Sequence, residues 1–309
     1  MLSLISSALC LSAIASVNAF VPVHKAASAN TAFAPTQSYI QPQPQPLQIN
    51  GFKREKCVLF MGWGPEPVWS AATVTESEAA NESGSSVRIM VQVPAETAAE
   101  YKTPGQYVQV TLNEETKPLF LAIASPPDAE NPSFEFLIKK TDSNGWITGA
   151  ADGSQIQISQ VLGNGFPMEE NLEGFKFDFP TQNVLLFAAG SGLAPIKAAM
   201  ESGQLNVGGG GGGRTARLYY GIQTASDLCY VDYFPKWEKM GFQVVPVLSQ
   251  PGPEWGGRTG YVQNCLEEDG VPIPRNSGAL LCGQKGMAES VTAILTKAGV
   301  FEGRILTNF

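Results

Sequence analysis

A continuous apolar run at residues 183–190, NVLLFAAG, constrains the fold of this 309-residue chain more than any other segment. Such a run is typical of a strand that is buried on both faces of a sheet. The residues that follow it, LAPIKAAMES, have a helical period. The same alternation continues in β-rich runs at 217–222, 242–248 and 279–283 and in helical stretches at about 227–240 and 286–298. Strands that alternate with helices predict a parallel sheet with helices on its faces.

The preceding part of the chain has a different pattern. Short β-rich runs at 87–93, 107–112, 120–125, 134–140 and 156–159 are separated by Gly, Pro, Asn and Asp. Several short strands at this spacing predict a small antiparallel β-barrel. The expected fold class is therefore α/β plus β. An antiparallel β-barrel in residues 66–175 precedes a Rossmann-like parallel-sheet domain in residues 180–309.

The first 60 residues have the composition of a targeting leader. Residues 4–17, LISSALCLSAIASV, have the length of a signal-peptide core and are too short for a stable membrane anchor. Val17-Asn18-Ala19 places small residues before Phe20, and residues 20–60 are rich in Ala, Ser, Thr, Gln and Pro. We expect a signal peptide over residues 1–19, a transit peptide over 20–60 and delivery to a plastid (chloroplast), because the arrangement resembles the two-part leaders of diatoms and related algae. Secretion with a disordered pro-segment is the alternative.

Charge and rare residue types exclude several classes of function. Residues 61–309 hold 16 basic and 27 acidic residues, a net charge of −11, which disfavours binding to nucleic acid, to an anionic membrane or to an acidic protein. We expect no membrane span in the mature protein. His24 is the single histidine, so removal of the leader excludes a Ser-His-Asp triad and histidine-ligated zinc or haem. The five cysteines form no CxxC pair, so we expect no intrinsic iron–sulfur cluster, and redox chemistry then depends on an organic cofactor or on cysteine.

The segment Gly190-Ser191-Gly192-Leu193-Ala194-Pro195 is the strongest local signal for a binding site. It follows the buried strand and opens a helix, so its glycines let a pyrophosphate approach the free N–H groups of the helix N-terminus. Pro195 suits the first turn of that helix. A plain strand-to-helix turn is the alternative, because the segment departs from GxGxxG by ending in proline.

Four weaker segments complete the set of candidates. Cys282-Gly283 ends a predicted strand, where a side chain reaches the ligand crevice of an open α/β sheet, although a free cysteine is usually a small buried apolar residue. Residues 104–108, PGQYV, and residues 145–148, GWIT, contain glycines that permit close backbone approach, and the hydroxyl of Thr148 can bond a phosphate oxygen. Each is an ordinary turn when taken alone. Phe309 ends the chain, as a frayed end or as a stacking lid.

In this order and spacing, the segments resemble the ferredoxin–NADP reductase superfamily over residues 66–309. The six that carry the resemblance are PGQYV at 104–108, FLAIAS at 120–125, GWIT at 145–148, GNGF at 163–166, GSGLAP at 190–195 and CG at 282–283, together with the terminal Phe309. The subgroup with the FLAIASPP segment is the plant and algal plastid oxidoreductase-like proteins. The resemblance implies an enzyme that binds FAD and NAD(P)H, moves a hydride between them and passes electrons to an unknown acceptor.

The resemblance also implies roles for individual residues. Cys282 and Phe309 would be catalytic, because they would lie beside the nicotinamide and over the flavin ring. The expected flavin-binding residues are Leu121, Ala122, Ile123, Ala124 and Ser125 with Gly145, Trp146, Ile147 and Thr148. The expected nucleotide-binding residues are Gly190, Ser191, Gly192, Leu193, Ala194, Pro195 and Gly283. No metal site is expected.

Three departures from the superfamily pattern affect these expectations. Leu119 and Leu121 take the places of an arginine that pairs with the flavin diphosphate and of a tyrosine that stacks on the flavin ring. Flavin would then depend on Lys117 and on backbone N–H groups. Gln250 takes the place of an arginine that contacts the 2′-phosphate of NADP, so Arg258 or Arg214 would have to supply that contact. The choice between NADH and NADPH stays open.

Two other functions are compatible with the sequence. A non-catalytic sensor or interaction protein could retain the fold with weak flavin binding or none, which the missing arginine and tyrosine would explain. A partner-specific electron-transfer subunit would need a docking patch. The visible spectrum of the purified protein distinguishes a flavoenzyme from the sensor.

Overall fold

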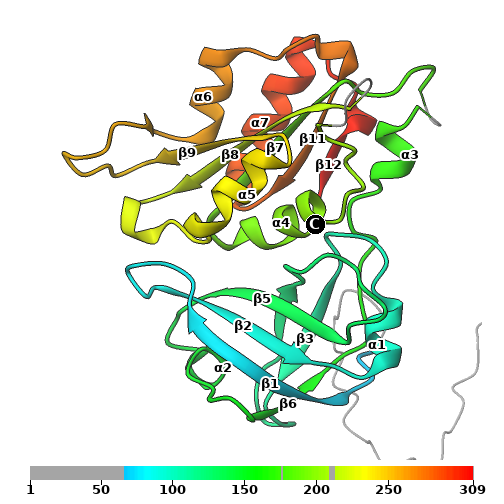
Figure 1. Ribbon diagram of the computed structural model, residues 1–309, viewed down its shortest axis with the longest axis vertical. Coiled ribbons are helices and arrows are strands. Elements are labelled where there is room, and N and C mark those ends of the chain that lie inside the picture. Colours follow the sequence, from blue (N-terminus) through cyan, green and yellow to red (C-terminus); the bar gives the residue numbers. More distant parts are fainter. Residues whose placement is uncertain (1–65, 175–176, 209–212, 309) are drawn as a thin grey trace, which may run out of the picture. The chain divides into compact units, whose positions relative to one another are not determined.

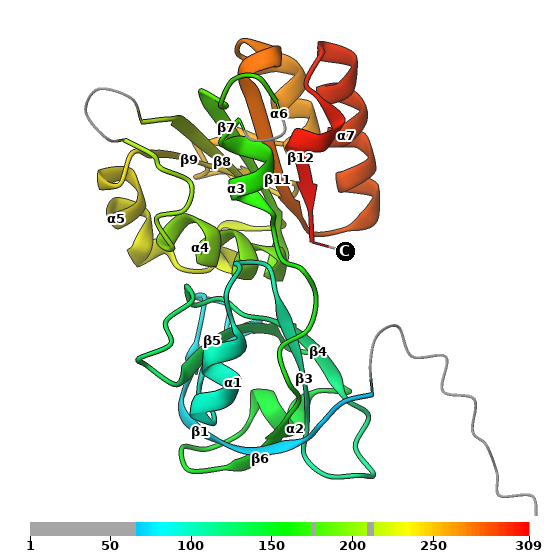
Figure 2. The same ribbon diagram turned by 90° about the vertical axis from the view of Figure 1, so that its right-hand side faces the viewer.

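Two six-stranded sheets, one antiparallel and one parallel, make up the protein, which confirms the predicted fold class (Figures 1 and 2). The computed structural model describes residues 66–308 apart from 175–176 and 209–212. The predicted leader in residues 1–60 and the terminal Phe309 lie outside the described residues. Both sheets belong to a single compact unit of the chain.

The antiparallel sheet closes on itself as a barrel. Its strands are β1 (Ser70–Ala79), β2 (Ser86–Gln92), β3 (Tyr107–Thr111), β4 (Leu119–Ala122), β5 (Ser133–Lys139) and β6 (Gln155–Ile158), in the order β4-β3-β6-β1-β2-β5. Two short helices, α1 (Ala95–Glu100) and α2 (Gly145–Thr148), lie in the connections. The N–H of Ala124 donates a hydrogen bond of 2.8 Å to the carbonyl of Glu135, which joins the chain after β4 to β5.

Alternating apolar residues build the core of the barrel. In β2, Val87, Ile89 and Val91 are buried, while the side chains between them are half-buried. The pattern is weaker in β1, where only Ala72 and Val74 enter the core. The sequence pattern therefore does not identify β1 as a strand, although it pairs with both β2 and β6.

The second half of the chain forms the parallel sheet with helices on both faces. Its strands are β7 (Asn183–Ala189), β8 (Thr215–Ile222), β9 (Phe242–Leu248), β10 (Arg258–Thr259), β11 (Ser277–Cys282) and β12 (Ile305–Thr307), in the order β10-β9-β8-β7-β11-β12. Its helices are α3 (Met168–Leu172), α4 (Leu193–Glu201), α5 (Phe234–Lys239), α6 (Val262–Asp269) and α7 (Lys285–Ala298). Figure 2 shows α4 and α5 on one side of the sheet and α6 and α7 on the other.

Burial on both faces explains the continuous apolar run of β7. Leu186 packs in the cluster that includes residues of α4 and α5, whereas Leu185 and Phe187 pack in the cluster that includes residues of α6 and α7. Neither face of the strand is left for polar side chains. The interpretation of residues 183–190 as a doubly buried strand agrees with this packing.

Several elements differ from the sequence pattern. The helical stretch expected at about 227–240 is reduced to α5, because Tyr230 adopts a left-handed conformation with φ of 58° and Pro235 lies in the first turn of the helix, which begins at Phe234. Helix α3 and the preceding Phe166 pack in the core of the parallel sheet, although they lie within the range expected for the barrel. Among the helices of the described ranges, none has the length and hydropathy that a bilayer span requires.

Candidate functional site

The order of the parallel strands reverses between β7 and β11. From β7 the chain proceeds to β8, β9 and β10 on one side and then returns to β11 on the other side of β7. Ligands of open α/β sheets bind outside the carboxyl ends of the strands at such a reversal. The Gly190–Gly192 loop follows β7. Cys282 is the last residue of β11, and Gly283 comes directly after it. The two predicted segments therefore meet at this reversal of strand order.

These two segments pack backbone against backbone. A side chain at Gly192 would collide with the carbonyl of Cys282, and a Cβ at Gly283 would lie 2.8 Å from the Cβ of Ala189. Gly190 has a φ of 56°, which favours glycine, and nothing lies within 4 Å of the position where its Cβ would be. The loop is therefore tight against β11 and open at Gly190, as a loop that admits a phosphate must be.

A cleft of about 590 Å³ opens at these carboxyl ends. This volume is in the range of cofactor and ligand sites. The residues that line it are Ser85, Ser86, Lys139, Ala189, Gly190, Ser191, Gly221, Ile222, Gln223, Asp227, Cys229, Ser249, Gln250, Gly260, Tyr261, Val262, Gln263, Gln284, Gly286 and Met287. Most follow strands of the parallel sheet, and three come from the barrel.

The Gly190–Gly192 loop, predicted to bind the nucleotide, contributes to the cleft through its first two residues. Gly190 and Ser191 line the cleft, whereas the side chains of Leu193, Ala194 and Pro195 are buried in the protein. Any ligand contact of those three predicted residues has to come from their backbone, because their side chains are buried. Pro195 occupies the first turn of α4, where its missing N–H leaves no hydrogen bond unmade.

Two charged side chains line the cleft, Lys139 and Asp227. The carboxylate of Asp227 accepts hydrogen bonds from Thr224 at 2.6 Å, from Ser83 at 2.8 Å and from Ser85 at 3.1 Å. The bond from Thr224 is the largest cause, and together these bonds hold the pKa of Asp227 below its usual range. Asp227 is therefore anionic at neutral pH.

Cys282 is half-buried at the end of β11. Burial raises the pKa of its thiol to about 11, although a hydrogen bond from Asn308 opposes the rise. The thiol is therefore protonated at neutral pH. An uncharged, polarisable sulfur suits contact with a planar ring better than nucleophilic attack, which needs the thiolate.

Asn308 lies between Cys282 and the barrel. Its amide nitrogen is 3.9 Å from Sγ of Cys282, and its amide oxygen would lie 3.1 Å from a Cβ at Gly105. Gly105 belongs to the predicted segment 104–108 that leads into β3. The crevice of the parallel sheet thus meets the start of β3 at Asn308, and Phe309 follows beyond the described residues.

The register of β4 shows where the side chain of Leu121 lies. Leu119 and Leu121 pair with Val110 and Val108, which are fully buried, and all four pack in the barrel core. Leu121 therefore points inward and offers its side chain to the core rather than to a ligand. Strand alternation instead places Ala122 on the outer face.

An aromatic pair on the outer face of β3 and β4 was not predicted. Phe120 is 62% exposed, and its ring lies 6.0 Å from that of Tyr107. The exposed ring of Phe120 and the half-buried ring of Tyr107 lie on the same face as Ala122 and form an apolar surface suited to a planar ligand. Alternation along the run FLAI at 120–123 could have indicated which side chains face outward. Every residue in the run is apolar, so the sequence shows no such alternation.

The rest of the predicted flavin strand is less accessible. Ile123 and Ala124 are fully buried. Ser125 is half-buried, and its hydroxyl accepts a hydrogen bond of 3.2 Å from the N–H of Glu135. Leu121, Ala122 and Ser125 are half-buried, and of these Leu121 packs against the barrel core, so the side chains of Ala122 and Ser125 are the better placed to contact a ligand.

Residues 145–148 form the single-turn helix α2. A Cβ at Gly145 would meet nothing within 4 Å, so the start of the turn is open to a ligand. Ile147 is buried, and Trp146 packs against the barrel core. The hydroxyl of Thr148 donates to the carbonyl of Asn144 at 3.2 Å, and its contact with a flavin phosphate stays a prediction.

Arg214 does not reach the cleft and so cannot supply the 2′-phosphate contact considered for it. Its side chain is buried, and it donates hydrogen bonds to the carbonyls of Leu172, Thr181 and Leu205. It also pairs with Glu173 at 2.8 Å. These partners fix Arg214 as a support for the chain between α3 and β8.

Arg258 is likewise bound elsewhere. Its guanidinium pairs with Glu268 and Asp269 at 2.9 Å each. Both acids are at the C-terminal end of α6, whereas the cleft-lining Tyr261 and Val262 are at its N-terminal end. Arg258 is thus directed away from the cleft, and Gln250 remains in the place of the missing arginine.

Comparison with known proteins adds independent evidence. Residues 186–293 match the family described as "Oxidoreductase NAD-binding domain". The "Fruit protein pKIWI502" of Actinidia deliciosa is 32% identical over 254 residues, which cover 79% of this chain and 76% of that protein. The "Naphthalene 1,2-dioxygenase/salicylate 5-hydroxylase systems, ferredoxin--NAD(P)(+), reductase component" of Ralstonia sp is 26% identical and is covered to 66%. The chain thus spans just under two thirds of that bacterial relative.

Solved structures share both halves of the fold. A cytochrome P450 reductase from Amycolatopsis has a TM-score of 0.63 at 24% identity, with 78% of this chain and 70% of that chain covered. A ferredoxin NADP+ reductase from Neisseria gonorrhoeae, solved with FAD and NADP, also has a TM-score of 0.63, at 14% identity, with 77% and 97% covered. The chain belongs to the ferredoxin–NADP reductase superfamily of FAD- and NAD(P)-dependent oxidoreductases.

The crevice between β7 and β11 lies within the segment that matches the NAD-binding family. The matched family segment begins within β7 and ends within α7, so it contains the Gly190–Gly192 loop and Cys282-Gly283. No group of three or more His, Cys, Asp or Glu side chains within the described residues is arranged to hold a metal ion.

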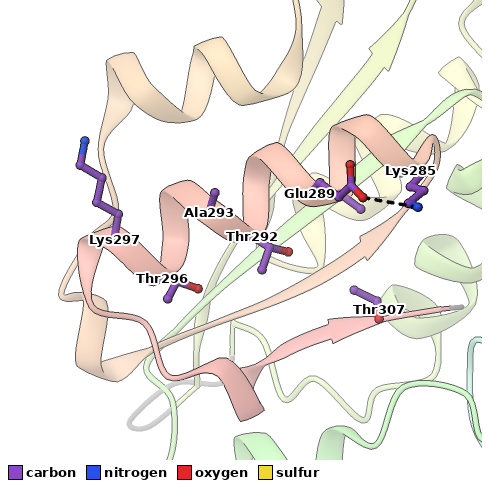
Figure 3. Close-up of a pocket in the computed structure, with 8 residues that line it drawn as sticks. Lys285, Glu289, Thr292, Ala293, Thr296, Lys297 and Thr307 are labelled. Atoms are coloured by element: carbon purple, nitrogen blue, oxygen red, sulfur yellow. Dashed lines mark ion pairs between the residues drawn. The ribbon is translucent and has the colours of Figure 1, made fainter.

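A second groove of about 750 Å³ runs along α7 and β12 (Figure 3). It is lined by Lys285, Ala288, Glu289, Thr292, Ala293, Thr296, Lys297 and Thr307. Its ion pair, between Lys285 and Glu289 at 3.6 Å, is exposed to solvent. The groove contains none of the predicted site residues and is wide open, so we assign no role to it.

Proposed function

We propose that this protein transfers a hydride from NAD(P)H to a bound FAD and passes the electrons to an acceptor outside the chain. The observation that carries the proposal is the meeting of the nucleotide loop, Cys282 and the start of β3 around Asn308. This arrangement brings the loop predicted to bind the nucleotide close to the segment that leads into β3, one of the barrel strands expected to hold the flavin. Hydride transfer requires the nicotinamide and flavin rings to be within about 3–3.5 Å of each other, so the segments that bind them have to lie close together.

The residues of the barrel fit a flavin. The outward-facing pair of Tyr107 and Phe120 provides an apolar surface for a planar ring, and the open space at Gly145 admits a phosphate. Lys117, exposed just before β4, supplies positive charge in the absence of the arginine at position 119. When bound, FAD supplies a ring that takes up two electrons as a hydride from the nicotinamide.

The protein's own part is to bind and orient. The N–H groups at the start of α4, which the Gly190–Gly192 loop leaves accessible, would hold the pyrophosphate of the nucleotide. The protonated thiol of Cys282 gives the nicotinamide an uncharged neighbour, and Asn308 holds that thiol in place. Tyr261, 61% exposed at the far end of the cleft, offers a flat surface to the adenine.

The relatives support an acceptor outside the chain. The Ralstonia relative is named as the reductase component of oxygenase systems, and another relative, from Acinetobacter baylyi, is named as the electron transfer component of anthranilate 1,2-dioxygenase. Both names describe proteins that deliver electrons to a separate oxygenase. We extend that division of labour, not those particular acceptors, to this chain.

The test is the visible spectrum of the purified protein, recorded before and after anaerobic addition of NADH or NADPH. We expect flavin absorbance, release of FAD on denaturation and bleaching by at least one nucleotide. A colourless protein that releases no flavin and does not bind added FAD would contradict the proposal and favour the non-catalytic sensor.

We further propose that the protein acts in a plastid. The support is the composition of residues 1–60, with a signal-peptide core at residues 4–17 followed by a segment rich in small and hydroxyl residues. A fluorescent protein fused behind residues 1–60 should accumulate in the plastids of a diatom host. Fluorescence in the medium instead would favour secretion.

A further inference from the structure

Lys197 of α4 and Glu135 of β5 form an ion pair that is buried between the two sheets. We propose that this pair is a positioning device that sets the placement of the flavin segment, Ala122–Ser125, relative to the nucleotide loop, Gly190–Gly192. The inference rests on the proposed function. It adds two residues that the resemblance and the sequence motifs did not single out.

The pair is closely held and shielded from water. Nζ of Lys197 lies 3.0 Å from Oε2 of Glu135 and 3.1 Å from Oε2 of Glu201, and it donates to the carbonyl of Ala124 at 3.4 Å. Lys197 is 1% exposed and Glu135 is 5% exposed. A buried charge is tolerated only where its partners satisfy it, so the ammonium group has one favourable position.

Three hydrogen bonds tie the flavin segment to this pair. The N–H of Ala124 donates to the carbonyl of Glu135 at 2.8 Å, and the N–H of Glu135 donates to the hydroxyl of Ser125 at 3.2 Å. The third is the bond from Lys197 to the carbonyl of Ala124. A displacement of Glu135 or of the ammonium group is therefore transmitted to Ala124 and Ser125.

The other end of the pair is fixed to the nucleotide loop. Lys197 is in α4, which begins at Leu193 directly after Gly192. The side chains of residues 193–200 are all buried, so this helix has no freedom to rotate within its packing. Movement of Lys197 relative to Glu135 is consequently movement of the nucleotide loop relative to the flavin segment.

Glu135 is also bound by the loop after β8. The hydroxyl of Tyr230 donates to Oε1 of Glu135 at 2.6 Å, and the ring of Tyr230 lies 5.4 Å from Nζ of Lys197. Each carboxylate oxygen of Glu135 thus binds a residue that packs with the parallel sheet. Tyr230 directly follows Cys229, which lines the cleft, so the second bond also ends next to the nucleotide site.

The Lys197–Glu135 pair matters because hydride transfer depends steeply on the distance between the two rings. Transfer of a hydride requires the two rings to approach to about 3–3.5 Å, and a misplacement of about 1 Å can lower the rate about a hundredfold. An apolar contact between the sheets would resist separation without fixing a position. A buried ion pair with directed hydrogen bonds both resists separation of the sheets and fixes their relative position.

The neighbouring charges permit a clean substitution. Arg88 pairs with Glu76 at 3.3 Å and Glu78 at 2.8 Å, and its Nε also lies 3.4 Å from Oε1 of Glu135, so loss of the Glu135 charge leaves Arg88 with two carboxylate partners. Glu201 keeps Lys236 at 3.2 Å and the indole of Trp237 at 2.8 Å. The double variant Lys197→Met, Glu135→Gln therefore removes the pair without leaving a buried unpaired charge, and the new amide oxygen can still accept from Tyr230.

The experiment uses the full chain with Lys197→Met, with the double variant and with the control Lys236→Met. Lys236 contacts the same Glu201 but its side chain is 58% exposed, so its removal spares the pair. The first readout needs no cofactor. Hydrogen–deuterium exchange at the N–H of Ala124 should become at least about tenfold faster in both test variants and stay unchanged in the control.

The second readout is stopped-flow reduction of bound flavin by the nucleotide that bleaches the unsubstituted protein. We expect the limiting rate to fall about tenfold or more in the double variant, while the Kd of the nucleotide and the flavin content change less than about threefold. A purely structural role would instead lower flavin content or nucleotide binding together with the rate.

Two results would overturn the proposal. One is an exchange rate at Ala124 equal to that of the unsubstituted chain in the double variant. The other is a limiting reduction rate equal to that of the unsubstituted chain. If Lys197→Met does not fold, the double variant alone decides. If no nucleotide reduces the unsubstituted protein, the proposed function fails, whereas the exchange measurement still decides whether the pair ties the two segments together.

Discussion

Cys282 has a thiol that keeps its proton at neutral pH. Burial raises its pKa to about 11, well above the pH of any plastid or cytosol. A thiolate at this position would attract the positively charged oxidised nicotinamide and hold it back. The neutral thiol avoids that preference while it retains the contact of a polarisable sulfur.

Replacement of Cys282 by alanine should slow flavin reduction by about tenfold or more with little change in flavin content, because the nicotinamide loses a contact that orients it. Stopped-flow absorbance measures the rate. The reduction rate of the unsubstituted protein should show no step between about pH 6 and 9 from this thiol, since it loses its proton only near pH 11.

The matched control is Cys265→Ala, which makes the same change in the buried cysteine of α6. It should affect stability but not the limiting rate. An equal rate for Cys282→Ala and the unsubstituted protein would remove Cys282 from the mechanism.

Gln250→Arg should raise kcat/KM with NADPH by about tenfold. Ser249 and Gln250 are uncharged at their end of the cleft, and both Arg214 and Arg258 are held by other partners, so a 2′-phosphate lacks an arginine there. A new charge-assisted hydrogen bond contributes about 1.5 kcal/mol or more, which is about tenfold. Steady-state kinetics with NADH and NADPH measure the change.

The control is Gln204→Arg, which adds the same charge at an exposed position outside the cleft. It should leave the ratio of kcat/KM for the two nucleotides unchanged. An unchanged ratio in Gln250→Arg would place the 2′-phosphate elsewhere in the cleft, with Lys139 as the next candidate.

At the scale of elements, the short strand β12 is held by an arginine buried among aromatic rings. Arg304 is fully buried, and its guanidinium lies 4.5 Å from the ring centre of Phe177 and 4.9 Å from that of Phe179. It donates hydrogen bonds to the carbonyls of Arg275 and Phe179. These contacts anchor β12 and, one residue after it, Asn308.

Arg304→Met should lower the free energy of unfolding by about 2–4 kcal/mol, because two buried carbonyls lose their donors and the cation–π contacts are lost. Thermal or urea unfolding measures the loss. Arg275→Met, at an exposed neighbouring position, should change stability by less than about 0.5 kcal/mol. Equal stabilities of the two variants would show that β12 is held by other contacts.

Elements with a strong local pattern could be predicted from the sequence. The apolar run of β7, the glycine loop after it and the long α7 each carry a signal that tertiary contacts reinforce. The inward direction of Leu121 could not be predicted, because a strand whose residues are all apolar has no visible alternation. β1 was missed for the opposite reason, since polar residues fill most of its positions.

The contacts between the two sheets could not be predicted from the sequence either. Lys197 and Glu135 are separated by 62 residues and belong to no motif, so only the fold brings them together. Arg258 is the opposite case, a residue for which the sequence suggested a contact that the fold does not form. Its position favoured a phosphate contact, but two acids at the end of α6 bind it first.

At the scale of the whole molecule, net charge controls the approach of a protein acceptor. Residues 61–309 carry a net charge of −11. The rate of electron transfer to an acidic carrier such as a ferredoxin should therefore rise by about threefold or more between roughly 10 and 150 mM salt, as screening weakens the repulsion.

An uncharged quinone is the control acceptor, since its reduction should not depend on salt. The rates are measured by coupled absorbance assays with each acceptor. A rate with ferredoxin that falls as salt rises would show that a local basic patch overrides the total charge.

The contact of Gly192 with the backbone of Cys282 has a consequence for how such proteins can diverge. A position that accepts no side chain cannot be varied to suit a different nucleotide, and the same holds for Gly283. Adaptation to a new nucleotide is thereby confined to the segments after β8 and β9, where side chains have room to change. The backbone around Gly192 and Gly283 can thus stay constant across lineages, while the side chains after β8 and β9 change.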